Sequence, residues 1–571
     1  AVNWTGSLAS SQADTVTLGN FTFNAGTAYD LLAISSLPNG VADPNPANDT
    51  TSVNDLSAAL AGIYTIGGAS PDFATFTLAV EALHLRGVSD SVTFNVRNGT
   101  YTEQIVINEV LGAGSANPVI FQSESGDSSL VTLTFSAIST ANYTLKLNGS
   151  DWLSFNKLTL QATNTSYGRV VDLGNYATHN TWSHCRLTGV STTSTSTSVA
   201  LFYTPSSGMD EHNLFENNRF VAGSYGLYFD GNYDTSYTEG VQIVGNVFQN
   251  QYYWGMHVRE LQATVMDGNT VFTNSTNASF IGIYPYYCFG GTTITNNQVY
   301  GLNYGGTGIY VNDVNGDSVN QCLIANNFVQ IGGSASQAWG INSSYGDYQN
   351  LIYNTVHVTN THASSRAFLN YCGDHKTLLN NILANSGGGK SIETSCTGSI
   401  NSSDFNDLYS SGTNLTSLDG TNHALLSDWQ TATGLDANSV SVDPGFVAVD
   451  SFAVNAVELD GAADPTPLVP LDIEGETRHA TTPDIGADEF TAPSVDAALL
   501  SFSSPTMPFA PGAQNVSVVL KNNGTANLTS ATLKWQINAV NQDSVLWMGN
   551  LASGATATVT LGTPTFNAGT T

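Results

Sequence analysis

The phrase NLFENNRF at residues 213–220 returns six times further along the chain, and this repeat decides the fold. It comes back as VQIVGNVF (241–248), TVMDGNTVF (264–272), TITNNQV (293–299), CLIANNFV (322–329), NLIYNTV (350–356) and TLLNNIL (377–383). Alignment on the last Asn gives one column, which consists of Asn218, Asn246, Asn269, Asn297, Asn327, Asn354 and Asn381. The gaps of 28, 23, 28, 30, 27 and 27 residues fit coils whose turns accept insertions, rather than helical repeats of fixed length.

Each phrase places apolar residues two apart around the Asn, which predicts a short strand, a turn and a second strand. When such Asn residues stack at the interstrand spacing of about 4.8 Å, each side-chain amide can donate a hydrogen bond to the next coil. The alternative is that Asn is only a common turn residue, and both interpretations predict a turn at this place. We expect Asn156 and Cys185 to continue the column toward the N-terminus and Asn406 toward the C-terminus.

A second apolar run follows most of these Asn residues and opens near a Gly. It reads GLYF at Gly226, GMHV at Gly255, GIY at Gly282, GIYV at Gly308 and GIN at Gly340. The predicted architecture is one coil of a parallel β-helix per repeat.

The one clear helix precedes the coils, at residues 71–86. Ser70 is its expected N-cap, Pro71 its first helical residue and Gly87 its end. A β-helix ends in an open apolar cross-section with free strand edges, and we expect this amphipathic helix to cover it.

The composition limits the class of protein. Apolar residues make up 41% of the 571 residues, which is enough for a large core. The net charge of −31 disfavours nucleic acid and anionic membranes as partners. No apolar run approaches the roughly 20 residues of a membrane span. Abundant Asn, Ser, Thr and Gly with little Lys is typical of an extracellular solenoid.

The two ends of the chain repeat one another. With an offset of 543, 17 of the 28 positions from Ala1 to Ala28 match those from Ser544 to Thr571. WTGSLAS and TVTLG thus return as WMGNLAS and TVTLG. We therefore expect the chain to be one period of a tandem repeat plus a short overlap, cut within a domain at both ends.

Two family resemblances follow from these motifs. GTYTEQIVI, the Asn-rich coils, DPGFV near Asp443, DIEG near Asp472 with Arg478, and DIGADEF near Asp484 resemble the right-handed parallel β-helix repeat proteins that Bacteroidota export. SVVLKNNGTANLTSATLKWQIN and LASGATATVTLG resemble a CARDB-type immunoglobulin-like domain. Alternating modules of these two kinds resemble very large type IX-secreted surface proteins, including gliding-motility adhesins.

The resemblances imply an all-β chain of three parts. Residues 64–490 are expected to be a right-handed parallel β-helix with its N-terminal capping helix. Residues 1–55 are expected to be the C-terminal part of one immunoglobulin-like β-sandwich, and residues 491–571 the N-terminal part of the next. Triplets that begin at Asp14, Asp90, Asp317 and Asp543 resemble the O-glycosylation signature of Bacteroidota, and are alternatively ordinary strand starts.

An enzyme is the alternative, because parallel β-helices also occur in polysaccharide lyases and hydrolases. The Asp-Asp, Gly-His-Gly and Arg-x-Lys signatures of a polygalacturonase-like site are absent. The basic residues on the coils are scattered and are interpreted as surface charges: Arg219, Arg259, Arg366, Lys376 and Lys390. No cofactor is predicted; calcium at Asp313, Asn315 and Asp317 is the alternative, although the Gly of NDVNGDS is misplaced for an EF-hand loop.

Aromatic clusters are the candidates for glycan contact, namely Tyr252, Trp254, Tyr284, Tyr286 and Tyr304. Exposed rings on successive coils can stack on sugars. The alternative is internal stacking that fixes the register of the coils.

Cys372 lies nine residues before Asn381 and Cys396 lies ten before Asn406, which puts both in one column on adjacent coils. Their Cα atoms are predicted to be about 5 Å apart, within reach of a disulfide, with a stacked pair of free thiols as the alternative. Cys185 is predicted to be buried and free.

The sequence therefore predicts a non-catalytic structural or adhesive module of a secreted cell-surface filament made of tandem repeats, with a role in surface attachment or gliding. The expected partners are neighbouring repeats of the same polypeptide and a surface polysaccharide or other extracellular polymer. The alternative is a β-helix protein that binds or degrades polysaccharide.

Overall fold

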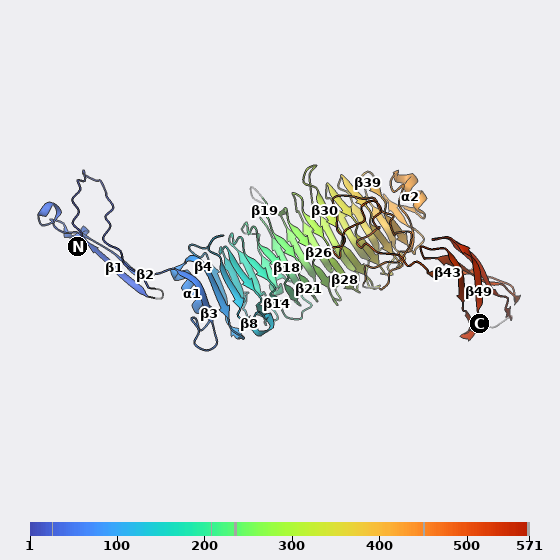
Figure 1. Ribbon diagram of the computed structural model, residues 1–571, viewed down its shortest axis with the longest axis horizontal. Coiled ribbons are helices and arrows are strands. Elements are labelled where there is room, and N and C mark those ends of the chain that lie inside the picture. The colour runs from blue at the N-terminus through green and yellow to red at the C-terminus, as the bar shows by residue number, and fades with distance from the viewer. Residues whose placement is uncertain (25–26, 207, 233–236, 449–450, 568–571) are drawn as a thin grey trace.

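A long stack of β-strands forms the body of the molecule, and the two chain ends lie beyond its opposite ends (Figure 1). The computed structural model describes residues 1–24, 27–206, 208–232, 237–448 and 451–567. Within these residues the chain is mostly β, and its body is a parallel β-helix of thirteen turns. The predicted β-helix is confirmed.

Three parallel sheets line the coils. Sheet 1 contains β3 (Leu60–Ile66), β4 (Val88–Val96), β7 (Val119–Ser123), β10 (Leu153–Asn156), β13 (Thr181–Ser183), β16 (Leu214–Glu216), β20 (Gln242–Val244), β24 (Val265–Asp267), β27 (Thr293–Thr295), β30 (Cys322–Ala325), β33 (Gln349–Ile352), β36 (Lys376–Leu379) and β39 (Ile400–Asp404). Sheet 2 contains β5 (Gly99–Thr102), β8 (Val131–Phe135), β11 (Thr159–Ala162), β14 (Arg186–Thr188), β17 (Arg219–Val221), β21 (Val247–Gln249), β25 (Thr270–Phe272), β28 (Gln298–Leu302), β31 (Phe328–Ile331), β34 (Thr355–Val358), β37 (Ile382–Asn385) and β40 (Asp407–Ser410).

Sheet 3 contains β6 (Ile105–Asn108), β9 (Leu145–Asn148), β12 (Val171–Gly174), β15 (Phe202–Thr204), β18 (Tyr225–Asp230), β22 (Trp254–Arg259), β26 (Ile281–Tyr286), β29 (Gly306–Asn312), β32 (Ala338–Ser344), β35 (Arg366–Tyr371), β38 (Lys390–Thr394), β41 (Thr416–Leu418) and β42 (Thr421–His423). Its last strand, β42, pairs antiparallel to β41. Two short strands, β19 (Thr238–Glu239) and β23 (Leu261–Gln262), pair outside these sheets. The first strand of the coils begins at Leu60, four residues before the predicted start.

Inward-facing side chains of like kind stack along the coils. Phe94, Phe121, Phe155, Trp182 and Phe215 occupy equivalent places on successive strands of sheet 1, with neighbouring ring centroids 4.8, 5.6, 5.8 and 5.2 Å apart. Alternate residues of each strand point to one face, so the apolar residues two apart in the repeat become one continuous core.

The helix α1 (Phe76–Arg86) lies beside the first coils and packs Phe76, Ala79, Val80 and Leu83 into the core (Figure 1). The predicted start was wrong. Thr75, whose side chain accepts from the backbone N–H of Leu78, is the N-cap. Residues before it are held extended, because Phe73 pairs with Ile66 of β3 and donates to the Thr65 carbonyl at 3.0 Å. Gly87 ends the helix with φ 62°, as predicted.

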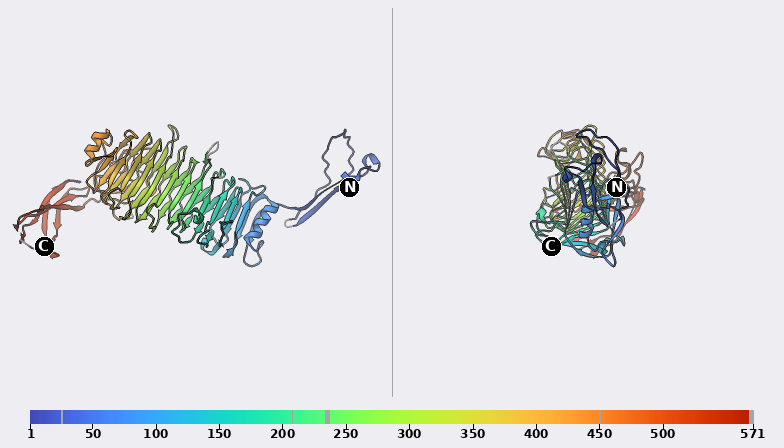
Figure 2. Two further views of the ribbon diagram at one scale, coloured as in Figure 1. Left: turned by 180° about the vertical axis from the view of Figure 1, so that it is seen from behind. Right: turned by 90° about the vertical axis from the view of Figure 1, so that its left-hand side faces the viewer.

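A second helix, α2 (Leu426–Thr433), lies at the far end of the coils; it is orange in Figures 1 and 2. Its Trp429 is fully buried and donates from Nε1 to Asp436 Oδ2 at 2.8 Å. The sequence analysis did not find this helix.

The flanking segments are antiparallel. On the N-terminal side β1 (Ala28–Ile34) pairs with β2 (Thr50–Ser57), and the 3-10 turns η1 (Pro38–Gly40) and η2 (Pro46–Asn48) connect them. On the C-terminal side β43 (Ala497–Ser504), β45 (Val516–Asn522) and β50 (Thr556–Gly562) form one sheet. The remaining pairs are β44 (Gly512–Ala513) with β51 (Thr565–Phe566), β46 (Leu528–Leu533) with β49 (Val545–Leu551), and β47 (Gln536–Ile537) with β48 (Val540–Asn541). Two further 3-10 turns, η3 (Ser128–Leu130) and η4 (Thr197–Val199), lie between coils.

Candidate ligand-binding face

The Asn column forms a buried hydrogen-bonded ladder between sheets 1 and 2. Asn218 Nδ2 donates to Asn246 Oδ1 at 3.0 Å, and the same contact repeats through every member to Asn406. The backbone N–H of each Asn from Asn218 to Asn381 donates to the same oxygen, as in the 2.9 Å contact from Asn246 to Asn269. Asn406 closes the ladder on Asp436 Oδ1 at 3.0 Å. The column therefore satisfies buried turn groups and offers no free atom to a ligand.

Asn156 does not belong to this column, which corrects the prediction. It ends β10 and pairs in register with Ser183, two residues before Cys185. Cys185 does occupy the column: its backbone N–H donates to Asn218 Oδ1 at 2.9 Å. The equivalent position one coil earlier is Leu158, because one left-handed residue, Lys157, separates it from the strand. A motif aligned by its Asn alone cannot tell the strand end from the turn.

Cys372 and Cys396 form a disulfide between adjacent coils, with their Cα atoms 5.0 Å apart. The predicted proximity is confirmed. Cys185 is buried and free, also as predicted, and Cys288 and Cys322 are buried free thiols too.

The Gly column explains why one face of sheet 3 is aromatic. A Cβ at Gly255 would lie 2.5 Å from the Gly282 carbonyl oxygen on the next coil and 2.8 Å from Val271 Cγ1. Only Gly fits this close approach of backbone to backbone. Gly255 has no partner in the register between β22 and β26. The rings of Trp254 before it and His257 after it lie with their centroids 5.0 Å apart.

Rings from five successive strands form a row on the outer side of sheet 3, from Tyr203 through Tyr228, His257 and Tyr284 to Tyr310. Neighbouring centroids are 5.5, 4.8, 5.2 and 4.9 Å apart. Their neighbours in sequence point into the core, so these rings point outward. Tyr225, Trp254 and Tyr286 lie beside the row on three of the same strands, and Trp339 lies on β32, the next strand of the sheet. We call these nine residues the aromatic face.

Three of the five predicted glycan-contact residues belong to this face, namely Trp254, Tyr284 and Tyr286. Tyr252 and Tyr304 lie in the turns that lead into β22 and β29. The prediction missed Tyr203, Tyr228 and Tyr310. Tyr228 and Tyr310 had a signal, because in GLYF, GMHV and GIYV the residue two after the Gly is aromatic each time, whereas Tyr203 in ALFYT follows no such Gly.

The aromatic face is partly open and partly packed. The rings stack on one another, as the register alternative predicted, and His257 is buried. Yet Tyr228, Tyr284 and Tyr310 remain half-buried rather than enclosed. A pocket of about 250 Å³ opens between Tyr310 and Trp339 at one end of the row. Trp254 Nε1 and His257 Nδ1 have no hydrogen-bond partner within the described chain.

A charged group borders the aromatic face. Arg259 Nε lies 3.5 Å from Asp230 Oδ1, and its Nη2 lies 3.4 Å from Glu260 Oε1. Asp230 also accepts from Tyr228 Oη at 3.1 Å and lies 3.5 Å from His257 Nε2. Burial lowers the pKa of His257, against the opposing effect of Asp230. Two carboxylates and a basic residue thus meet on the coils, each carboxylate paired to the same guanidinium.

Two of the basic residues interpreted as surface charges are buried instead. Lys376 is fully buried, and its ammonium donates to Ser343 Oγ at 2.7 Å, Asn370 Oδ1 at 2.6 Å and the Cys372 carbonyl at 2.6 Å. Burial lowers its pKa to about 7. Arg366 is 8% exposed and pairs with Glu393 at 2.7 Å. The prediction was wrong for both residues, because a single charged residue in a strand pattern does not reveal whether polar neighbours will enclose it.

The oxygens of Asp317 and Asn315, which the calcium alternative requires as ligands, accept hydrogen bonds from backbone N–H groups. Asp317 Oδ1 accepts from the backbone of Val319 and Asn320, at 2.7 and 2.8 Å, and Asn315 Oδ1 accepts from Asp347 at 3.0 Å. Throughout the described ranges, no three His, Cys, Asp or Glu side chains converge as metal ligands would.

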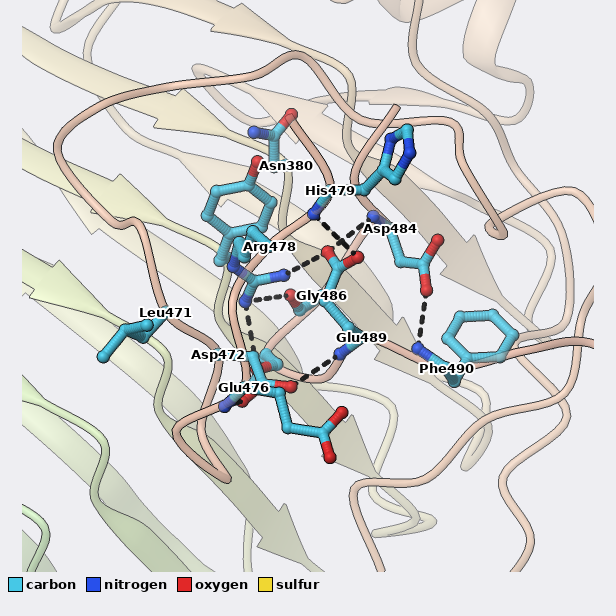
Figure 3. A network of polar contacts seen from close by, with 12 residues as sticks. Asn380, Leu471, Asp472, Glu476, Arg478, His479, Asp484, Gly486, Glu489 and Phe490 are labelled. Carbon is cyan, nitrogen blue, oxygen red and sulfur yellow. Dashed lines mark hydrogen bonds and ion pairs between the residues drawn. The ribbon is translucent and has the colours of Figure 1, made fainter. Parts of the chain in front are cut away.

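The DIEG, Arg478 and DIGADEF motifs assemble into one network at the C-terminal end of the coils (Figure 3). The Arg478 guanidinium lies over the Tyr353 ring at 3.7 Å and pairs with Glu489 at 3.1 Å. Its Nη2 donates to Asn326 Oδ1 and to the Gly486 and Ala487 carbonyls. Asp472 accepts a hydrogen bond from the backbone N–H of Glu489 at 3.1 Å, and Asp484 accepts one from the backbone N–H of Phe490 at 2.6 Å. These motifs fasten residues 472–489, which follow the last coil, onto the β-helix.

Comparisons with known proteins agree with a β-helix. A family model described as "Periplasmic copper-binding protein (NosD)" matches residues 156–339, about a third of the chain. No curated protein matches. No helix of the described residues is long and apolar enough to cross a membrane.

Similar solved structures include a pectin methylesterase from Aspergillus niger (14% identity, 68% of this chain and 92% of that one, TM-score 0.23). A rhamnogalacturonan lyase is 12% identical, with a match that covers 76% of this chain and 97% of the lyase and a TM-score of 0.33. The Streptococcus pneumoniae surface protein and adhesin PfbA is 11% identical, with a match that covers 60% of this chain and 93% of PfbA and a TM-score of 0.34. Likenesses this distant support no conclusion about function.

Proposed function

We propose that this chain is a non-catalytic adhesive module of an extracellular surface protein, and that its aromatic face holds a polysaccharide. The row of rings from Tyr203 to Tyr310 carries the proposal. It places about one aromatic ring per coil in line, at a spacing on the scale of consecutive sugar units. Because the faces of neighbouring rings stack on one another, a sugar would meet the ring edges and the Tyr310 end of the row. The pocket between Tyr310 and Trp339 is large enough for one sugar ring.

The charge of the chain favours a neutral or basic polymer. The net charge of −31 repels polyanions at long range. Metal-bridged binding of an acidic polymer would need a converging ligand set, and the side chains within the described ranges offer none.

An extracellular location is supported by the Cys372–Cys396 disulfide, because such bonds persist in oxidising compartments. The repeat of residues 1–28 at 544–571 supports an arrangement in series with further copies, as in a filament. We further propose that the protein is exported by type IX secretion and acts in surface attachment or gliding.

Binding of neutral polysaccharides tests it. Affinity electrophoresis or calorimetry with a panel of neutral and basic glycans would give the dissociation constant for the intact chain. We expect Tyr310→Ala and Trp339→Ala each to weaken binding about fivefold to tenfold, because one ring face is lost. Tyr300→Ala is the matched control: Tyr300 stacks on Phe272 at 5.7 Å in sheet 2, away from the face, and its loss leaves binding unchanged. Equal effects from all three variants would contradict the proposal.

A polysaccharide-degrading enzyme is the second candidate, and the Asp230, Arg259 and Glu260 group favours it. A carboxylate next to a cation at a sugar-binding face is the arrangement that acid–base chemistry would use. New reducing ends or unsaturated products from the same panel would detect turnover. Turnover that Asp230→Asn abolishes would replace the non-catalytic proposal.

A further inference from the structure

A column of side chains lies at the corner where the strands of sheet 3 end. Each of its residues follows the last residue of its strand and has a left-handed backbone, with φ 51° at Tyr287, 53° at Asp313 and 57° at Tyr345. The strand residues before them are in register from coil to coil. The three side chains therefore hold equivalent places on consecutive coils, about 4.8 Å apart. We call them the corner column.

The rings of the corner column are open to solvent. Tyr287 is 39% exposed and Tyr345 is 51% exposed. Tyr371, which ends β35 on the next coil, is 45% exposed, and its ring lies at 78° to the ring of Tyr345 with the centroids 5.1 Å apart. Exposed rings offer a face to a ligand, unlike the stacked rings of the aromatic face. Asp313 thus has accessible aromatic surface on both sides.

The carboxylate of Asp313 has no cation beside it. It is half-buried, Asn315 Nδ2 lies 3.4 Å from its Oδ1, and no ion pair joins it to a Lys, Arg or His of the described ranges. Glu260 holds the equivalent left-handed position one coil before Tyr287, and its carboxylate is paired with Arg259 at 3.4 Å. Asp313 therefore keeps a negative charge that a ligand can neutralise.

An ammonium group fits this arrangement. A cation near the face of a Tyr ring is attracted by the ring quadrupole, and a carboxylate beside it adds a charge-assisted hydrogen bond. The net charge of −31 attracts cations to the chain at long range. A metal ion does not fit, because no three His, Cys, Asp or Glu side chains converge in the part of the chain that the structure describes.

The position of the corner column indicates which molecule carries the ammonium group. The ring of Tyr287 lies 4.2 Å from the ring of Tyr286, which belongs to the aromatic face. A polysaccharide on that face reaches the corner column by passing Tyr286. Tyr287 and Tyr345 are two interstrand steps apart, about 9.6 Å, which leaves room for a sugar unit at each ring and one amine between them at Asp313.

We propose that Tyr287, Asp313 and Tyr345 bind a protonated amino group of the polysaccharide, so that the polymer held by this protein contains amino sugars with free amines. Asp313 supplies the opposite charge, and the two rings supply faces for the sugar units and for the cation. The inference rests on the proposed function, because it assigns the chemical class of the same glycan.

Isothermal titration calorimetry on the intact chain with three matched oligosaccharides tests the inference. They are a β-1,4-linked glucosamine hexamer, its fully N-acetylated counterpart and a glucose hexamer of the same linkage. N-acetylation removes the charge of each amine and keeps the sugar backbone. At mildly acidic pH, where the amines are charged, we expect the glucosamine hexamer to bind about tenfold more tightly than either neutral hexamer. Added salt is expected to reduce this preference.

Two charge variants locate the preference. Asp313→Asn removes the charge and keeps a residue type that tolerates a left-handed backbone. It is expected to reduce the preference for the glucosamine hexamer by a factor of about three or more, with the affinity for the neutral hexamers unchanged. Asp317→Asn is the matched control in the same loop. Asp317 Oδ1 is held by the backbone N–H groups of Val319 and Asn320, so we expect the preference to stay the same.

A pair of ring variants tests the aromatic contribution. Tyr345→Asn removes a ring at a left-handed position and is expected to weaken binding of the glucosamine hexamer about threefold. Tyr176→Asn is its control. Tyr176 is 60% exposed with φ 65° on an earlier coil, outside the corner column, and its loss is expected to leave binding unchanged.

The outcomes separate this inference from the proposed function. Equal affinity for the three hexamers, or an unchanged preference in Asp313→Asn, would overturn the inference and leave glycan binding intact. No binding of any glycan would overturn both. An oligolysine that binds as tightly as the glucosamine hexamer would also overturn the inference, because charge without sugar rings would then be sufficient and the partner would be a basic peptide.

Discussion

Residues 2–19 and residues 545–562 are identical at 11 of 18 positions and have different structures. In the C-terminal copy Val545–Leu551 pairs with β46 and Thr556–Gly562 pairs with β45. In the N-terminal copy the matching residues form no strand. Leu551, Val559 and Leu561 are 8%, 7% and 6% exposed, whereas Leu8, Val16 and Leu18 are 47%, 38% and 64% exposed.

The difference between the copies lies in their neighbours and not in their sequence. The C-terminal copy has β45 and β46 beside it, and the N-terminal copy has no such strands. A strand without a partner leaves its backbone groups to water and its apolar face exposed, so pattern and propensity alone do not form it. The coils show the opposite extreme, because most of their strands have a partner on each side.

The largest expected contrast comes from one substitution made in both copies. Leu561→Ala removes a buried side chain and is expected to cost the C-terminal strands about 2–5 kcal/mol. Leu18→Ala, at the matching position, is expected to cost less than about 0.5 kcal/mol because that side chain is already in water. Urea unfolding of the intact chain, followed by the fluorescence of Trp4 at the N-terminal copy and of Trp535 and Trp547 at the C-terminal copy, measures both. Equal losses would mean that the N-terminal copy is packed as well.

A second contrast extends the comparison into the coils. Asn297→Ala removes a side chain that donates to Asn327 and accepts from Asn269, both at 3.0 Å, and leaves those buried groups unpaired. We expect a loss of about 3 kcal/mol. Asn156→Ala is the control: Asn156 Oδ1 has no hydrogen-bond partner within the described chain, and we expect a loss below about 1 kcal/mol. Thermal unfolding of the coils measures the difference, and a larger loss for Asn156 would contradict the ladder.

The smallest expected effect is a dependence on pH. Burial lowers the pKa of Lys376 to about 7 in the folded chain, from its ordinary value of 10.5. Between these values the unfolded chain binds more protons than the folded chain, so the free energy of unfolding rises with pH. Relative to Lys376→Met, wild type is expected to gain up to about 1.4 kcal/mol per pH unit from pH 7.5 to 9. Parallel pH profiles of the two proteins would contradict this.

Much of the fold could be predicted because repetition supplies evidence that a single strand lacks. The Asn column aligned seven turns of the coils, and the position of Cys372 and Cys396 relative to it placed two thiols in contact. Where repetition was thin, prediction failed. Asn156 matches the sequence motif, but Leu158 occupies the equivalent of the Asn-column position. The two residues are separated only by the left-handed turn residue Lys157.

The candidate site was harder to predict than the fold. The aromatic face forms because Gly255 and its equivalents let the backbone come close, which brings rings on both sides of the Gly together. Clusters such as Tyr284 and Tyr286 stood out in the sequence, whereas Tyr203 follows no Gly motif and joins the row only through register. Lys376 escaped notice for the same reason: Ser343, Asn370 and Cys372 reach it from two coils.

Hydrogen–deuterium exchange on the intact chain tests most directly whether partner strands, rather than sequence, decide the structure of the repeated segment. Amides of residues 545–551 and 556–562 are expected to exchange slowly, because they are bonded to β46 and β45. Amides of residues 2–8 and 13–19, which match those residues at 9 of 14 positions, are expected to exchange at the rate of an unstructured chain. Equal protection of the two segments would contradict the account.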